Sequence, residues 1–81
     1  MNITVKTFAS VSDICGFREK VYSLPDGSSV SALLEVVVSE YPGLGRLKAG
    51  LLSAVNEEHS SITRVLSNND VVAFFPPVSG G

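Results

Sequence analysis

The 81-residue sequence is poor in cysteine, in basic residues and in long apolar runs, and each shortage excludes a class of protein. Its one cysteine, Cys15, has no partner within the chain for a disulfide, which favours a reducing compartment. No apolar run approaches the roughly 20 residues of a membrane-spanning helix, and no signal-peptide pattern opens the chain. We therefore expect a cytoplasmic protein that does not interact with membranes.

Charge and length exclude further classes of function. Six basic residues against eight acidic ones give a net charge of −2, and the basic residues are scattered along the chain. Without a basic cluster to neutralise phosphates, nucleic-acid binding is disfavoured. A chain of 81 residues fits one small domain and leaves little material to enclose a deep active site. We expect a module that works through a partner protein.

Hydrophobic periodicity predicts four main strands and one long helix. Residues 3–8 and 19–24 alternate as strands, and residues 51–56 and 71–75 form two further apolar strands. A short helical turn is expected within residues 10–17, and a brief edge strand within residues 56–61. The helix begins at Val30 after an N-cap at Ser29, and Pro42 and Gly43 end it.

This order predicts an α+β fold in which a mixed sheet of four to five strands packs against one main helix. The first and last strands are both apolar, so pairing them at the centre of the sheet would bury both. That arrangement is the β-grasp (ubiquitin-like) fold. We expect residues 1–75 to form this domain and residues 76–81 to form a flexible C-terminal tail that ends in Gly-Gly.

The end of the chain, Phe74-Phe75-Pro76-Pro77-Val78-Ser79-Gly80-Gly81, is the most distinctive segment. We expect two exposed phenylalanines here, and two prolines then lead to a terminus of two glycines, which have no side chains. Bare glycines can enter a narrow channel, and a glycine carboxylate is unhindered. Because a strand alternates its faces, the two phenylalanines cannot both lie beneath the helix, and we predict that Phe75 faces a partner.

The whole chain resembles the small subunits of molybdopterin synthase, a family of ubiquitin-like sulfur carriers. The resemblance is strongest over Ala54-Val55-Asn56 and over residues 70–81, where the ending FFPPVSGG is highly specific. The family often has Gly-Asp before the last strand, whereas Asn69-Asp70 stands here. Asparagine tolerates the left-handed conformation, so the turn can form.

The resemblance implies a chemistry that starts at the Gly81 carboxylate. An adenylating (E1-like) enzyme would use ATP to form an acyl-adenylate, and a sulfur donor would replace AMP to give a thiocarboxylate. The sulfur would then pass to cyclic pyranopterin monophosphate in the large synthase subunit, within an expected heterotetramer. The tail residues Pro76, Pro77, Val78, Ser79 and Gly80 would deliver Gly81. The chain itself would bind neither a cofactor nor a metal.

Other functions remain open from the residues alone. A carrier for another pathway, such as thiamine or tungsten cofactor, would share the tail chemistry, and a ubiquitin-like modifier would join its terminus to lysines. A redox enzyme built on Cys15 is disfavoured, because a lone cysteine beside Ile14 is typical of a small buried apolar residue. His59 with Glu57 and Glu58 lacks the spacing of a metal site.

Overall fold

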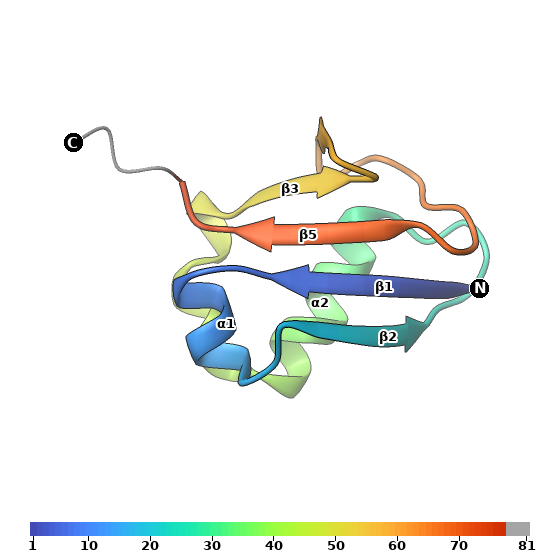
Figure 1. Cartoon of the computed structure of the whole chain (residues 1–81). Coiled ribbons are helices and arrows are strands. Elements are labelled where there is room, and N and C mark those ends of the chain that lie inside the picture. Colours follow the sequence, from blue (N-terminus) through green and yellow to red (C-terminus); the bar gives the residue numbers. More distant parts are fainter. Residues whose placement is uncertain (78–81) are drawn as a thin grey trace.

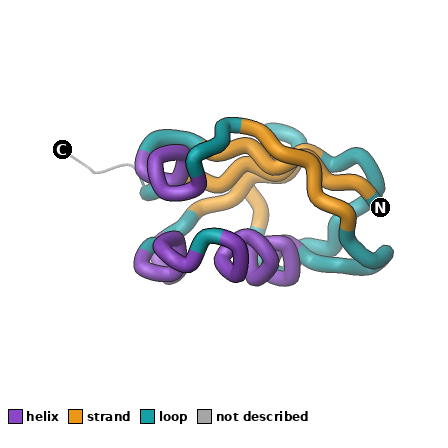
Figure 2. The backbone as a smooth tube through the Cα atoms, turned by 90° about the horizontal axis from the view of Figure 1, so that it is seen from below, coloured by secondary structure: helices purple, strands orange, loops and turns teal. Residues whose placement is uncertain are grey.

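The computed structural model describes residues 1–77 and contains a five-stranded sheet with the order β2-β1-β5-β3-β4. Figures 1 and 2 show the sheet as one layer and the main helix as a second layer behind it. The strands are β1 (Asn2–Thr7), β2 (Glu19–Ser23), β3 (Leu52–Val55), β4 (Glu58–Ser60) and β5 (Val71–Phe75). The helices are α1 (Ser10–Cys15), α2 (Val30–Glu40) and two 3₁₀ helices, η1 (Pro42–Arg46) and η2 (Lys48–Gly50).

The pairing of the first and last strands is confirmed. β1 and β5 run parallel at the centre of the sheet, with Thr4 opposite Val71 and Thr7 opposite Phe74. All other neighbours are antiparallel, so the sheet is mixed. Because β1 and β5 point the same way, the C-terminal ends of both strands lie at the same end of the sheet (Figure 1). The β-grasp prediction is therefore confirmed, with β4 as the brief edge strand.

The core lies between the sheet and α2. The apolar face of α2 is buried at Val30, Leu33, Leu34 and Val37, as the helical spacing predicted. Ile3, Val5, Val55, Val72 and Phe74 meet this face from the sheet, and each is at most 1% exposed. Burial of these side chains is the main force that holds the small domain together.

The N-terminus of α2 is satisfied by its predicted cap and by a distant loop. The hydroxyl of Ser29 accepts a hydrogen bond from the backbone N–H of Ala32 at 3.2 Å. The backbone N–H of Val30 donates to the carbonyl of Arg64 at 2.9 Å. The loop before β5 therefore fastens the helix at the end where four backbone N–H groups lack helical partners.

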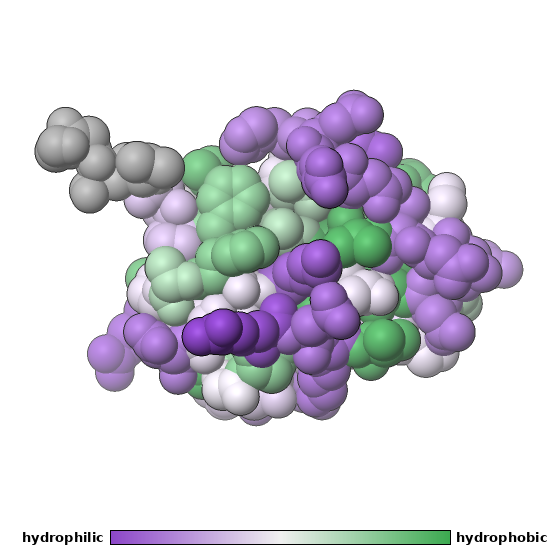
Figure 3. Space-filling view, in the orientation of Figure 1, coloured by the Kyte–Doolittle hydropathy of each residue, from purple (hydrophilic) through white to green (hydrophobic). Residues whose placement is uncertain are grey.

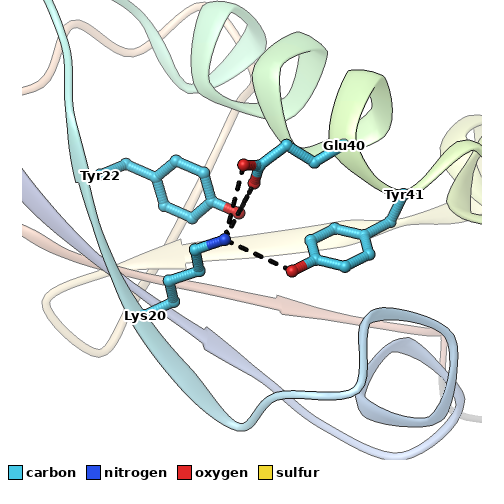
Figure 4. Close-up of polar contacts among 4 residues, drawn as sticks. All are labelled: Lys20, Tyr22, Glu40 and Tyr41. Atoms are coloured by element: carbon cyan, nitrogen blue, oxygen red, sulfur yellow. Dashed lines mark hydrogen bonds and ion pairs between the residues drawn. The ribbon is translucent and has the colours of Figure 1, made fainter.

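A polar cluster fastens the other end of α2 to the edge strand β2 (Figure 4). The hydroxyl of Tyr22 donates to Oε1 of Glu40 at 2.5 Å, and Nζ of Lys20 lies 3.2 Å from the same oxygen. Nζ of Lys20 also donates to the hydroxyl of Tyr41 at 3.3 Å and lies 5.2–5.8 Å from the ring centroids of Phe17, Tyr22 and Tyr41. Aromatic rings attract such a cation, so the ammonium of Lys20 is held both by hydrogen bonds and by cation–π contacts.

These contacts shift the pKa values of Glu40, Lys20 and Tyr22. The hydroxyl of Tyr22, followed by the ammonium of Lys20, holds the pKa of the Glu40 carboxyl below its ordinary value. Hydrogen bonds to Tyr41 and Glu40 raise the pKa of Lys20. Burial, followed by the hydrogen bond to Glu40, raises the pKa of Tyr22. The folded state thus favours ionised Glu40, protonated Lys20 and neutral Tyr22.

The first prediction concerns Phe74, the largest fully buried side chain. Replacing Phe74 with alanine should lower the free energy of unfolding by about 3–5 kcal/mol, because a buried ring leaves a cavity. Phe75→Ala is the matched control and should cost about 1 kcal/mol or less, because Phe75 is only half-buried on the other face. Urea denaturation measures both, and equal losses would contradict the assignment of faces.

The second prediction concerns acid stability. Because the pKa of Glu40 is lower in the folded chain, its contribution is complete above the ordinary value of 4.5 and is lost as the pH falls below it. Stability of the wild type should therefore fall more steeply from about pH 5 to about pH 3 than that of Glu40→Gln. Urea midpoints across this range test it, and parallel curves for the two proteins would rule out the linkage.

Candidate functional site

The predicted tail begins where the central strand β5 ends. Pro76 and Pro77 follow Phe75 directly, and Pro77 lies beside η2, where a β carbon on Gly50 would be 3.9 Å from its ring. Val78, Ser79, Gly80 and Gly81 lie outside the described residues. The structure therefore positions the first two residues of the predicted tail and the strand from which it departs.

The two phenylalanines before the tail lie on opposite faces of the sheet. Phe74 is 1% exposed and belongs to the core, so the expectation that both rings are exposed was wrong for this residue. The alternation of β5 puts Phe75 on the face away from α2, as predicted. There its ring meets the imidazole of His59 edge-on, with ring centroids 5.8 Å apart. A role for Phe75 in partner binding remains a prediction.

Phe75 is part of an apolar surface on the open face of the sheet, which we call the open-face patch. Leu52 pairs with Phe75, and Ala54 pairs with Ala73 in the next row. Phe8 follows β1 at the same edge and is 50% exposed, and Leu52 is 38% exposed. The patch thus consists of Phe8, Leu52, Ala54, Ala73 and Phe75. Contiguous exposed apolar surface of this kind marks an interaction site.

Figure 3 views this face of the molecule. Apolar side chains gather over the end of β5, and hydrophilic side chains border them. An apolar centre with a polar rim is the usual anatomy of a protein interface.

Beside the patch, the sheet face is hollowed to a volume of about 390 Å³. The hollow exists because Ala54 and Ala73, which pair across β3 and β5, have small side chains and lie between larger ones. Seven residues line it: Lys6, Phe8, Ala54, Asn56, Glu57, Val71 and Ala73. A second hollow of about 510 Å³ lies between the end of β1 and α1, and Phe8 and Lys6 line both. Lys6 and Phe8 therefore lie between the two depressions.

A hydrogen-bond network fixes the polar end of the first hollow. Oδ1 of Asn56 accepts from the backbone N–H of Val71 at 3.0 Å, and Nδ2 of Asn56 donates to Asp70 at 2.9 Å. The backbone N–H of Ser67, followed by the amide of Asn56, lowers the pKa of the Asp70 carboxyl. Asn69 adopts the left-handed conformation with φ 71°, so the prediction for this turn is confirmed.

The other candidate residues carry little chemistry in the structure. Cys15 is 5% exposed, and burial, followed by the nearby Glu40, raises the pKa of its thiol. A raised pKa disfavours the reactive thiolate, and this argues against a redox enzyme built on Cys15. Within residues 1–77 no group of three or more histidine, cysteine, aspartate and glutamate side chains could hold a metal ion. No helix in this part of the chain is long and apolar enough to cross a membrane.

Sequence reasoning found Phe75 but missed Phe8, Leu52 and the hollow. Phe8 carried a signal, because it is an apolar residue at an outward position directly after Thr7, the last residue of β1. Leu52 and Ala54 could join Phe75 only after the register between β3 and β5 was known. The hollow depends on that register as well.

Comparison with known proteins identifies the family of this chain. The model of the ThiS family matches residues 5–81. The chain is 31% identical over 83 residues to the molybdopterin synthase sulfur carrier subunit of Chlamydomonas reinhardtii, and the match covers 100% of both chains.

Two solved structures extend the likeness to the fold. The crystal structure of SAMP1 (small archaeal modifier protein 1) from Haloferax volcanii superposes with a TM-score of 0.88 at 25% identity, over 100% of both chains. A chain in the complex of subunits 1 and 2 of the molybdopterin-converting factor from Helicobacter pylori matches with a TM-score of 0.70 at 21% identity, again over 100% of both chains. Since the family model and a full-length relative both match, the chain belongs to the ThiS family.

Proposed function

We propose that this chain is the sulfur-carrier subunit of molybdopterin synthase and acts in molybdenum cofactor biosynthesis in the cytoplasm. The observation that carries the proposal is the full-length match to a molybdopterin synthase sulfur carrier subunit. The ending FFPPVSGG supports it, because its two phenylalanines complete the central strand β5 and the tail residues come directly after them in the sequence. A tail that starts at a rigid strand can be presented to another protein without disturbing the fold.

The proposed chemistry takes place at Gly81. A carboxylate is a poor electrophile, so an adenylating enzyme first transfers AMP from ATP to the Gly81 carboxylate and releases pyrophosphate. A sulfur donor then displaces AMP and leaves a thiocarboxylate. This sulfur passes to cyclic pyranopterin monophosphate, and water restores the carboxylate. Tethering the sulfur to a protein raises its effective concentration at the acceptor.

General acids and bases for these steps would come from the partners. No charged side chain lies between Phe74 and Gly81, so the tail supplies no ionisable side chain to act as a general acid or base. The tail residues Pro76, Pro77, Val78, Ser79 and Gly80 place Gly81 in the partner's site. From Pro76 to Gly81 an extended chain reaches roughly 20 Å at about 3.3 Å per residue, which allows a buried site.

The proposed partners are the adenylating enzyme and the large synthase subunit, with two small and two large subunits in the synthase. The open-face patch is the surface that we assign to docking of the large subunit. It contains Phe75, the residue immediately before the tail, so the large subunit would contact the patch next to the site that receives the tail. The complex of subunits 1 and 2 from Helicobacter pylori contains the same fold and supports such an assembly.

A second candidate function is that of a ubiquitin-like modifier. It is favoured by the likeness to SAMP1, a modifier protein by name, which covers the full chain at a TM-score of 0.88. The same activated Gly81 would then form an isopeptide bond with a lysine. Conjugates of higher mass in cells would favour this function, whereas a sulfur carrier forms none. A carrier for a thiamine or tungsten cofactor pathway would differ only in the acceptor of the sulfur.

The third prediction tests the chemistry at the terminus. Protein produced together with its adenylating enzyme should contain a species heavier by the exchange of one oxygen for one sulfur, located by mass spectrometry in the C-terminal peptide. Deleting Gly81, or adding an alanine after it, should abolish sulfur transfer. The thermal midpoint should stay at the wild-type value, because the core ends at Phe74. Transfer by the truncated chain would refute the assignment to Gly81.

The fourth prediction tests the docking surface. Phe75→Asp should weaken binding to the large subunit by roughly tenfold or more, because it puts a charge in the apolar centre of the interface. Val21→Asp is the matched control, since Val21 is a 60% exposed apolar residue on the edge strand β2, away from the patch. Isothermal titration calorimetry measures both. Equal dissociation constants for Phe75→Asp and wild type would remove the patch from the interface.

A further inference from the structure

The turn between β3 and β4 places a non-glycine residue at a position where glycine is favoured. Val55 pairs with Glu58, so Asn56 and Glu57 form a two-residue turn, and both have positive φ angles of 50° and 71°. Turns of this kind favour glycine at the second position, as in Asn-Gly. Asparagine tolerates the left-handed conformation, but a glutamate there costs free energy. Glu57 is therefore the strained residue of the pair.

Asn56 has a structural reason for its place, whereas Glu57 has none. The side chain of Asn56 connects the turn to Val71 and Asp70. The side chain of Glu57 makes no hydrogen bond and no ion pair with any of residues 1–77. Strained residues tend to lie at functional sites, so this one calls for a function.

The position of Glu57 indicates what that function is. Glu57 lines the hollow of about 390 Å³ on the open face, together with Phe8, Ala54 and Ala73 of the open-face patch. The hollow is thus continuous with the surface that we assign to docking. Its depth is bounded by small side chains, so it has room for a side chain supplied by another protein.

The charges in the hollow select the kind of side chain that fits. Its basic residue, Lys6, lies 3.8 Å from the carboxylate of Glu19 and is already paired. Of the two ionised groups that line it, Glu57 is the one without a partner among the described residues. A cation with an apolar stem would pair with this carboxylate and cover the alanines.

We propose that Glu57 is a specificity-determining residue for the large synthase subunit: its carboxylate receives an arginine side chain of that subunit, whose aliphatic stem lies in the hollow over Ala54 and Ala73. The inference rests on the proposed function, because it names a contact in the same docking surface. The strain at Glu57 persists because only a residue with a carboxylate can make this contact, and glycine cannot.

Three variants of the full chain separate the contact from the strain. Glu57→Gln removes the charge and keeps the strain, so binding to the large subunit should weaken about fivefold with an unchanged Tm. Glu57→Gly removes both, so binding should weaken by a similar factor while the Tm rises by about 4 °C. Glu58→Gln is the matched control: it removes the same charge one residue away, outside the hollow, and should bind as the wild type does.

Calorimetric titration of the large subunit, repeated at low and high salt, gives the dissociation constants. The fivefold difference should shrink at high salt, because salt screens an exposed ion pair. The inference is overturned if Glu57→Gln binds as tightly as wild type, or if Glu57→Gly melts no higher. A dimer of the chain alone that depends on Glu57, seen by sedimentation, would assign the hollow to a second copy and also overturn it.

The same titration distinguishes this inference from the proposed function. Wild-type chain that binds the large subunit, and loses affinity on Phe75→Asp but not on Glu57→Gln, would overturn the inference alone. Wild-type chain that does not bind the large subunit at all would overturn both.

Discussion

The parallel pairing of β1 with β5 is the contact on which the rest of the structure depends. It joins the first strand of the chain to the last, so it closes nearly the whole chain into one unit. Such a non-local contact costs loop entropy, and burial of Ile3, Val5, Val72 and Phe74 beneath α2 offsets it. The parallel direction has a further consequence: both strands finish at the same end of the sheet, where Phe8 follows β1 and Phe75 is the last residue of β5.

The alternation of β5 couples the core to the docking surface. Phe74 is buried in the core, and this fixes the position of Phe75 on the other face and the point from which Pro76 departs. The middle row of the open face carries Ala73 and Ala54, which pair with each other and leave the hollow beside the patch. One five-residue strand thus contributes to the core, to the exposed surface and to the root of the tail.

The fold could be predicted from the sequence because its signals are local. The spacing of apolar residues in α2, the cap at Ser29 and the turn at Asn69 each depend on a few neighbouring residues, and all are confirmed. Pairing β1 with β5 followed from their shared apolar character. The exposure of Phe74 was misjudged, because adjacent phenylalanines before a tail look alike in sequence until the face of the helix is known.

The site was harder to predict because it is assembled across strands. Phe75 followed from alternation, but Leu52, Ala54 and Phe8 reach it only through the register of three strands. The positive φ of Glu57 has no sequence signal at all, since Asn-Glu does not resemble the Asn-Gly of a favoured turn. The last four residues, which carry the proposed chemistry, were identified from the sequence motif rather than from packing.

The distribution of charge separates what stabilises the fold from what the surface offers to a partner. Each of the three lysines lies beside a glutamate, and the pair of Lys20 with Glu40 braces α2 against β2 on the helix side of the sheet. Glu57, on the open face, has no such partner among residues 1–77. Its strained backbone can persist because the side chain of Asn56 holds the turn to β5 through Val71 and Asp70. A strained backbone conformation persists where the surrounding contacts hold it in place. The hydrogen-bond network that holds the turn therefore keeps the unpaired carboxylate of Glu57 beside the patch.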